Sequence, residues 1–397
     1  MDAASEQFPA PEVSDLQSLI ATPGGPTPST AHRIFIGPYG LRAGWSLLIF
    51  VAMLASILTT VRVVHDYNKA KRHQQAVSAA VAAGKPASSV SESKADASAP
   101  ISMKDGVVSE GVAFAAVFLV SLLMAFIERR RVTVYGLGGE RSLARFFVGA
   151  CWGLAALSLL IGILRALHLV SFDAQLDHGW TVIGYGALAL LCFLFVGLLE
   201  EYLFRGYLQF TLTRGLVGLG NRISPVHGRS IAFWMATLIT SALFFLAHTS
   251  NNGEDLVGLA LVFVAGIAFV VALWRTGSLW WAIGFHMAWD WAQSFLYGVP
   301  DSGMLMKERM FATHASGNPV LSGGTVGPEG SVLCIPVLAL MIVVLLFTRK
   351  SPGPPLEQEA RPVSAEPVAA TLEECTAFFA RSLWSGSSFW CSISTAR

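Results

Sequence analysis

Eight stretches of apolar residues, each long enough to cross a lipid bilayer, constrain this chain more than any other feature. A helix rises about 1.5 Å per residue, so crossing about 30 Å of hydrocarbon takes roughly 20 residues. The stretches are 44–64, 107–127, 146–168, 181–213, 230–248, 256–274, 278–298 and 331–348. Backbone polar groups inside a bilayer must be satisfied within the protein, which favours helices. The sequence therefore predicts an all-α, polytopic membrane helix bundle of about eight transmembrane helices.

The composition agrees with a chain that avoids water. Charged residues make up 13% of the 397 residues, compared with about 25% in soluble globular proteins. The net charge is +1, because 27 Lys and Arg oppose 26 Asp and Glu. A nucleic-acid partner is therefore not expected, because so small a charge gives no electrostatic footprint for a polyanion. The expected surroundings are the lipid bilayer, and the oligomeric state is left open.

The polar segments between and beyond the apolar stretches suggest how the chain is organised. Segments rich in Pro, Ser, Ala or Lys lack the pattern of a packed core. The expected parts are a flexible N-terminal tail (1–40), a first transmembrane helix (44–64), a polar low-complexity loop (65–106), a membrane bundle (107–348, with its core at 181–298) and a C-terminal tail (349–397).

Arginine-rich short loops predict the orientation of the bundle. Loops 128–145 and 214–229 carry most of these arginines, whereas loops 169–180 and 249–255 carry acidic residues and no Lys or Arg. Because Lys and Arg concentrate in cytoplasmic loops, the arginine-rich loops are expected inside. The chain is then a multi-pass protein of the cell (inner) membrane with both termini in the cytoplasm, and access to an internal site is expected from the cytoplasm.

Charged residues inside an apolar span are costly and therefore indicate function. The span 181–213 contains Glu200, Glu201 and Arg205. On a helix, Glu201 and Arg205 lie four residues apart on one face and can form an ion pair. Glu200 lies about 100° around the helix and has no cation in this motif. An unpaired carboxylate in such surroundings suits a proton acceptor.

Two further spans each contribute polar side chains. The span 230–248 ends at His248, and His286 and Asp290 share a helix face in the span 278–298. A lone intramembrane histidine is more often a hydrogen-bonded core residue than a catalyst. Three helices that each carry inward-pointing polar groups nevertheless predict one intramembrane polar cavity.

The order of these motifs, EExxxR, FxxxH and HxxxN/D, resembles the CPBP family of intramembrane proteases. This family includes the CAAX prenyl endopeptidases of the Rce1 type. The matching residues are Glu200, Glu201, Arg205, Phe244, His248, His286 and Asp290. The resemblance is tightest over residues 195–295 and extends more loosely over 107–348.

The resemblance implies a peptide hydrolase of the CAAX prenyl protease type that needs no cofactor. Its catalytic residues would be Glu200, Glu201, His248, His286 and Asp290, with Arg205 and Phe244 as structural support. Glu200 and His248 would activate a water molecule, and His286 and Asp290 would stabilise the oxyanion. The implied substrate is a membrane-associated, prenylated or otherwise lipidated peptide or protein.

Other functions stay open at this stage. Glu200, His248, His286 and Asp290 are metal ligands by type, so a metalloprotease is one alternative, although the chain contains no HExxH. A membrane transporter or channel that uses the buried charges as a proton or substrate site is another. A catalytically silent scaffold would not need the full set of motifs.

Overall fold

The computed structural model describes residues 30–37, 40–86, 100–251, 253 and 255–348, and these residues are mostly helical. The elements are α2 (Thr30–Phe35), β1 (Ile36–Gly37), β2 (Gly40–Leu41), α3 (Ala43–Ala82), α4 (Met103–Ile127), η2 (Val132–Tyr135), α5 (Ser142–Ala166), β3 (Val170–Gln175), α6 (Trp180–Glu200), η3 (Glu201–Leu208), α7 (Gln209–Ile223), α8 (Gly228–His248), α9 (Leu256–Thr276), α10 (Trp280–Trp291), η4 (Ala292–Leu296), β4 (Phe311–Ala315), α11 (Pro319–Ser322), η5 (Pro328–Gly330) and α12 (Cys334–Phe347).

Each of the eight expected spans falls on a helix. Among the described residues, six helices are long and apolar enough to cross a membrane: α3, α4, α5, the continuous helix Trp180–Ile223, α8 and α9. The other two apolar stretches form α10 with η4, and α12, which are shorter. The expected fold class, an all-α polytopic membrane bundle, is confirmed.

The fourth apolar stretch forms one unbroken helix that changes its winding in the middle. It begins as α6, passes through the π-helical segment η3 and continues as α7 to Ile223. The helix includes Arg205, as the apolar stretch 181–213 predicts, and extends ten residues beyond that stretch. A π-helical turn inserts an extra residue per turn and is frequent at functional sites. The change of winding begins at Glu201, directly after Glu200.

Helices α5 and α10 approach so closely that glycine is needed at their contact. A Cβ atom added at Gly149 would lie 2.0 Å from the carbonyl oxygen of Trp281, and one at Gly153 would lie 2.2 Å from that of Phe285. On the facing helix, a Cβ at Gly284 would lie 2.0 Å from the carbonyl oxygen of Phe146. Small residues allow this backbone contact between membrane helices. It fixes the position of α10, which carries two of the expected site residues.

Adding one methyl group at this contact is expected to destabilise the bundle. We expect Gly153→Ala to lower the free energy of unfolding by about 1–3 kcal/mol, the usual cost of overpacking. Gly162→Ala is the matched control on the same helix, since nothing lies within 4 Å of its added Cβ. Thermal melts of both variants in detergent measure the difference. A Gly153→Ala melting temperature equal to that of Gly162→Ala would contradict the close contact.

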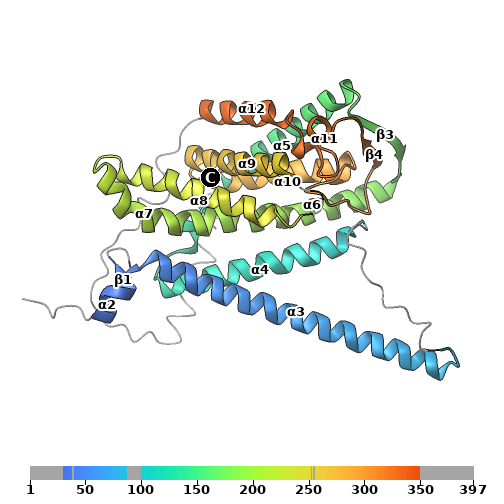
Figure 1. The fold of residues 1–397 in the computed structure, drawn as a ribbon, viewed down its shortest axis with the longest axis horizontal. Coiled ribbons are helices and arrows are strands. Elements are labelled where there is room, and N and C mark those ends of the chain that lie inside the picture. Colours follow the sequence, from blue (N-terminus) through green and yellow to red (C-terminus); the bar gives the residue numbers. More distant parts are fainter. Residues whose placement is uncertain (1–29, 38–39, 87–99, 252, 254, 349–397) are drawn as a thin grey trace, which may run out of the picture.

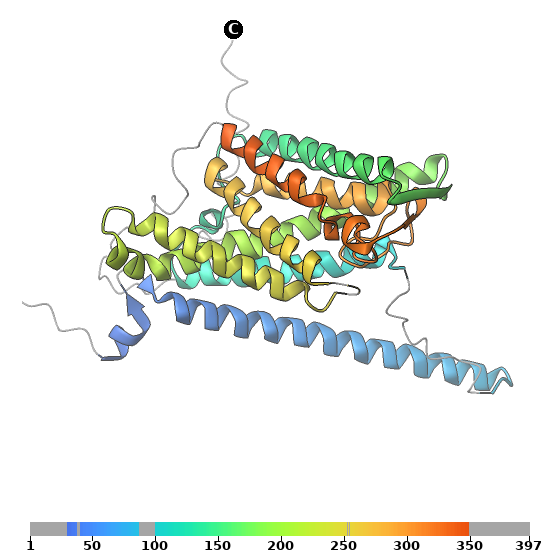
Figure 2. The same cartoon turned by 45° about the horizontal axis from the view of Figure 1, so that its top comes forward.

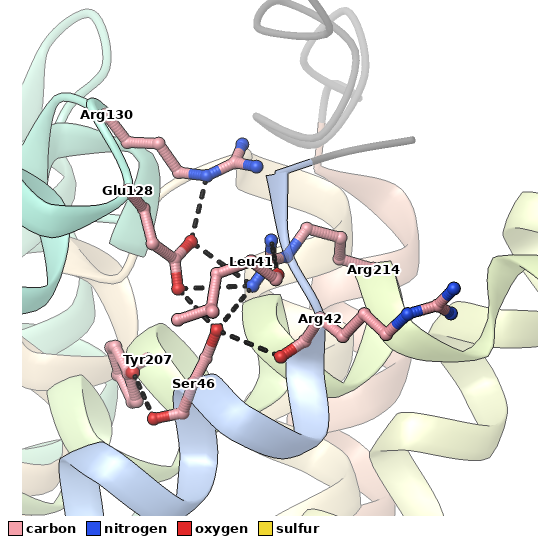
Figure 3. Close-up of polar contacts among 7 residues, drawn as sticks. All are labelled: Leu41, Arg42, Ser46, Glu128, Arg130, Tyr207 and Arg214. Atoms are coloured by element: carbon pink, nitrogen blue, oxygen red, sulfur yellow. Dashed lines mark hydrogen bonds and ion pairs between the residues drawn. The ribbon is translucent and has the colours of Figure 1, made fainter. Parts of the chain in front are cut away.

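A buried polar cluster attaches α3 to the bundle (Figure 3). Glu128, at the end of α4, accepts a hydrogen bond from Ser46 Oγ at 2.5 Å and pairs with Arg130 Nε at 3.0 Å and Arg214 Nη2 at 3.2 Å. Arg214 also donates to the carbonyl oxygen of Leu41 at 2.8 Å. The cluster joins α3, α4 and α7. Two arginines of the expected cytoplasmic loops therefore have a structural role as well.

The first helix is longer than the sequence predicts. Where a polar loop was expected from residue 65, α3 continues to Ala82, packs on the bundle near its start and extends past the end of the bundle (Figures 1 and 2). The Ala, Lys and Gln residues of this segment have high helix propensity, which explains the extension. The expected N-terminal tail also contains structure, because residues 30–37 and 40–41 form α2 and the antiparallel pair β1–β2. The expected C-terminal tail, 349–397, lies outside the described residues.

A two-stranded sheet and a long connection cover the end of the bundle that lies away from α2. Strand β3 pairs with β4 in antiparallel register, from Val170 opposite Ala315 to Gln175 opposite Phe311. Figure 1 shows this sheet at the end of the bundle away from α2 and the α7–α8 connection. Residues 297–333, which follow η4, contain β4, α11 and η5 and lie at this end.

Candidate active site

A cavity of about 310 Å³ lies inside the bundle, and most of the expected site residues line it. The lining residues that the sequence predicted are Glu200, Phe244, His248, His286 and Asp290, from α6, α8 and α10. Glu201 and Arg205 are buried beside the cavity and are not among its lining residues. The structure therefore brings the three motifs together and divides their residues into two groups.

His286 lies at the centre of the site and contacts three carboxylates. Its Nδ1 lies 3.0 Å from Glu201 Oε1. Its Nε2 lies 3.6 Å from Glu200 Oε2 and 3.4 Å from Asp290 Oδ2. The ring is stacked on Phe269, with 5.2 Å between the centroids. Carboxylates at both ring nitrogens hold the imidazole in one orientation.

Glu201 is buried and forms an ion pair in the protein interior. Its Oε1 accepts from Arg205 Nη1 at 3.0 Å, and this expected ion pair is fully desolvated, since the two residues are 0% and 2% exposed. The Arg205 guanidinium lies over the Phe244 ring at 4.0 Å from its centroid, a cation–π contact. Because the same Oε1 also contacts His286, Glu201 links the arginine to the histidine.

Glu200 is the member of the glutamate pair that faces the cavity. Its side chain is 24% exposed, whereas that of Glu201 is 0% exposed. Among the described residues, its recorded polar partner is His286. The Glu200 carboxylate is therefore accessible to a water molecule in the cavity and is adjacent to a proton-carrying imidazole.

His248 contributes a second imidazole from α8. Its Nδ1 lies 2.8 Å from the carbonyl oxygen of Phe244. A carbonyl oxygen accepts hydrogen bonds, so Nδ1 carries the proton and Nε2 of the neutral ring is left as an acceptor. The Phe244 ring packs against the imidazole at 4.5 Å between centroids. His248 is therefore oriented by its own helix and can accept a hydrogen bond in the cavity.

Three carboxylates that the sequence analysis did not select also line the cavity: Glu110, Asp301 and Glu329. Ser294 Oγ donates to Asp301 Oδ2 at 3.0 Å. Glu329 accepts from Gln293 Nε2 and, at 2.5 Å, from the backbone N–H of Ser302. Burial raises the pKa of Asp301 to about 6 and also raises the pKa of Glu329.

The cavity lies toward the end of the bundle that carries residues 297–333. Its lining includes the first turns of α4 and α12 and the last turns of α8 and α10. The arginine-rich loops 128–145 and 214–229 are at the other end (Figure 1). With the orientation that the sequence predicts, the cavity is nearer the outer face, so the expected access from the cytoplasm does not fit its position.

The donor set of the cavity consists of carboxylates and imidazoles. Over the described ranges, no group of three or more His, Cys, Asp or Glu side chains has an arrangement that would hold a metal ion. The contacts of Glu200, His286 and Asp290 are those of hydrogen-bonded and paired groups.

Helical spans around a polar cavity with paired carboxylates and histidines mark a candidate functional site within the membrane. Residues 182–292 match the family model of the type II CAAX prenyl endopeptidase Rce1-like proteins. This segment includes every site residue that the sequence predicted. This match supports the resemblance over that segment and points to a peptide hydrolase, and the long apolar helices indicate a multi-pass membrane protein. No curated protein and no solved structure matches the chain.

Proposed function

We propose that this protein is an intramembrane endopeptidase in which Glu200 and His248 activate the attacking water. The observation that carries the proposal is that these two side chains, from α6 and α8, line one cavity with His286 and Asp290 of α10. General base catalysis needs an accessible proton acceptor near the water, and Glu200 is the accessible member of the glutamate pair.

In this mechanism, Glu200 takes a proton from the water as the oxygen attacks the peptide carbonyl. His248 accepts a hydrogen bond at Nε2 and orients the same water molecule. The negative charge that develops on the carbonyl oxygen is stabilised by the N–H of His286 Nε2. Glu200 then gives its proton to the leaving amine as the C–N bond breaks, which leaves a carboxylic acid and an amine.

Asp290 contributes to this mechanism through His286. An ionised carboxylate accepts hydrogen bonds and cannot donate one to an oxyanion. Asp290 Oδ2 lies 3.4 Å from His286 Nε2, where it orients the imidazole. Glu201 and Arg205 position the other ring nitrogen in the same way. We therefore propose that Asp290, Glu201 and Arg205 are positioning residues.

The proposed substrate is a peptide or protein segment at the membrane, including a prenylated or otherwise lipidated one. Apolar side chains from two helices form part of the cavity wall beside the polar residues: Phe204 of η3, and Leu261 and Phe269 of α9. Such a wall suits a substrate that is partly apolar. Expulsion of bulk water by the substrate would strengthen the electrostatic interactions at the site.

Cleavage of a peptide library tests the proposal. We expect purified protein in lipid nanodiscs to cleave prenylated or unmodified library members at defined bonds, with turnover that resists chelators. His248→Ala is expected to lower kcat by about 10²–10⁴, the usual contribution of an acid–base group. His314→Ala is the control, since His314 is exposed and pairs with Asp173 outside the cavity. Wild-type turnover by the His248 variant would defeat the proposed role, and loss of activity in chelator would favour the metalloprotease alternative.

A further inference from the structure

One helix that carries none of the three motifs reaches the centre of the candidate active site. Helix α9 contributes Phe269, which is 7% exposed and lines the cavity. The Phe269 ring is nearly parallel to the His286 imidazole, with 17° between the planes and 5.2 Å between the centroids. The Arg205 guanidinium carbon also lies over this ring, 5.2 Å from its centroid. One side chain of α9 therefore contacts both the histidine and the arginine of the site.

The carboxylates hold the two nitrogens of His286 unequally. Nδ1 lies 3.0 Å from Glu201 Oε1, which is within the usual hydrogen-bond range. The carboxylate oxygens of Glu200 and Asp290 lie 3.6 Å and 3.4 Å from Nε2, which is beyond that range. The ring torsion of a histidine occupies broad wells and is easily changed. The stacked ring of Phe269 therefore restricts the tilt of the imidazole at the nitrogen where the polar contacts are long.

The position of Phe269 is itself fixed by two neighbouring helices. One turn earlier on α9, a Cβ atom added at Gly266 would lie 3.0 Å from Ser241 Oγ, so α9 packs closely on α8. On the other side, the Phe285 ring of α10 meets the Phe269 ring edge-on, with 5.8 Å between the centroids. Phe285 directly precedes His286. The Phe269 ring is therefore held by the helices that carry the two histidines of the site.

We propose that Phe269 is a positioning residue, whose ring fixes the tilt of the His286 imidazole and so directs Nε2 toward the oxyanion. The inference rests on the proposed protease function and adds α9 to the three helices that carry its motifs. The contact with Arg205 is a cation–π interaction. It connects the same ring to the ion pair that holds Glu201, so Phe269 aligns the histidine with its buried partners.

Replacement of the ring by a flexible side chain tests this role in the purified full-length protein. Phe269→Met keeps much of the volume and removes the flat ring face. We expect kcat for peptide hydrolysis to fall by about 10–10²-fold with KM within about threefold, because a misplaced catalytic group slows the chemical step more than binding. Phe269→Tyr keeps the ring and should keep kcat within about threefold of wild type. Phe50→Met is the matched control, since Phe50 is 1% exposed and its ring is stacked on Tyr207 outside the cavity.

A double variant shows whether Phe269 acts through His286. If it does, Phe269→Met combined with His286→Gln should have the same kcat as His286→Gln alone, because the ring then has no imidazole to orient. A side chain that contributes only to general stability would instead reduce the kcat of the His286 variant by a further factor. Multiplication of the two losses would therefore overturn the inference.

The remaining outcomes separate the inference from the function on which it rests. Wild-type kcat in a folded Phe269→Met protein, or a change in KM alone, would make the ring only a part of the cavity wall and overturn its positioning role. Equal losses in Phe269→Met and Phe269→Tyr would do the same. Where Phe269→Met does not fold, Phe269→Leu, which also lacks a ring, gives the same comparison. Absence of Glu200-dependent cleavage in wild-type protein would defeat the proposed function itself.

Discussion

Glu200→Gln is expected to lower kcat for peptide hydrolysis by about 10³–10⁴ with little change in KM. Glutamine has nearly the shape of glutamate but cannot accept the proton of the attacking water. Because the Glu200 side chain is 24% exposed to the cavity and does not carry a fully buried ion pair, the variant should fold normally. Single-turnover measurements with a fluorogenic substrate separate the chemical step from substrate binding.

Glu110→Gln serves as the matched control, because it removes another carboxylate of the cavity wall without touching the three motifs. We expect it to change kcat by less than about tenfold, below the usual contribution of a general base. Near-wild-type kcat in Glu200→Gln, together with a large loss in a correctly folded Glu201→Gln, would exchange the roles of the two glutamates. Equal losses in Glu110→Gln and Glu200→Gln would indicate that the total charge of the cavity matters more than one base.

Arg205→Met is expected to destabilise the fold by about 3–5 kcal/mol, the cost of leaving a buried charge without its partner. Arg205 is 2% exposed and Glu201 is 0% exposed, so water cannot replace the lost ion pair. Methionine keeps much of the side-chain volume against Phe244 and Phe269, which limits the effect of an unfilled cavity. Equilibrium unfolding in detergent, followed by tryptophan fluorescence, measures the change in free energy.

A double replacement distinguishes the lost charge from lost packing. Because Arg205→Met with Glu201→Gln removes both charges, it should recover a large part of the stability. Activity should stay low in the double variant, since His286 loses the carboxylate at Nδ1. Arg62→Met, on the exposed face of α3, should leave stability nearly unchanged. A stable Arg205→Met protein would show that the Glu201 pair is not needed for the fold.

Most of the fold could be predicted from the sequence, because a bilayer gives a simple length requirement. All eight apolar stretches are helical, and the fourth continues past Arg205 as expected. The extension of α3 to Ala82 was missed, since residues 65–82 are polar and of low complexity and their helix propensity gives no hydrophobic pattern. The short structured segments 30–37 and 40–41 were missed for a similar reason.

Part of the candidate site could be predicted, because charged residues are rare inside apolar spans and stand out there. Glu200 and Asp290 stand out as charged residues in apolar helices, and Glu110 is likewise a charged residue within the expected span 107–127. That residue could have been selected. Asp301 and Glu329 lie in a loop, where a charge is ordinary, and only the folding of residues 297–333 over the cavity reveals them. Their positions depend on long-range contacts that no local pattern specifies.

The change of winding after α6 has a consequence for the two neighbouring glutamates. Chemically they are the same side chain, but η3 begins between them, so Glu200 ends a regular helix and Glu201 opens a wider turn. One carboxylate faces the cavity with 24% of its side chain exposed, and the other is 0% exposed and paired with an arginine. The backbone thus places two identical groups in different surroundings, and helix geometry rather than residue type sets this difference.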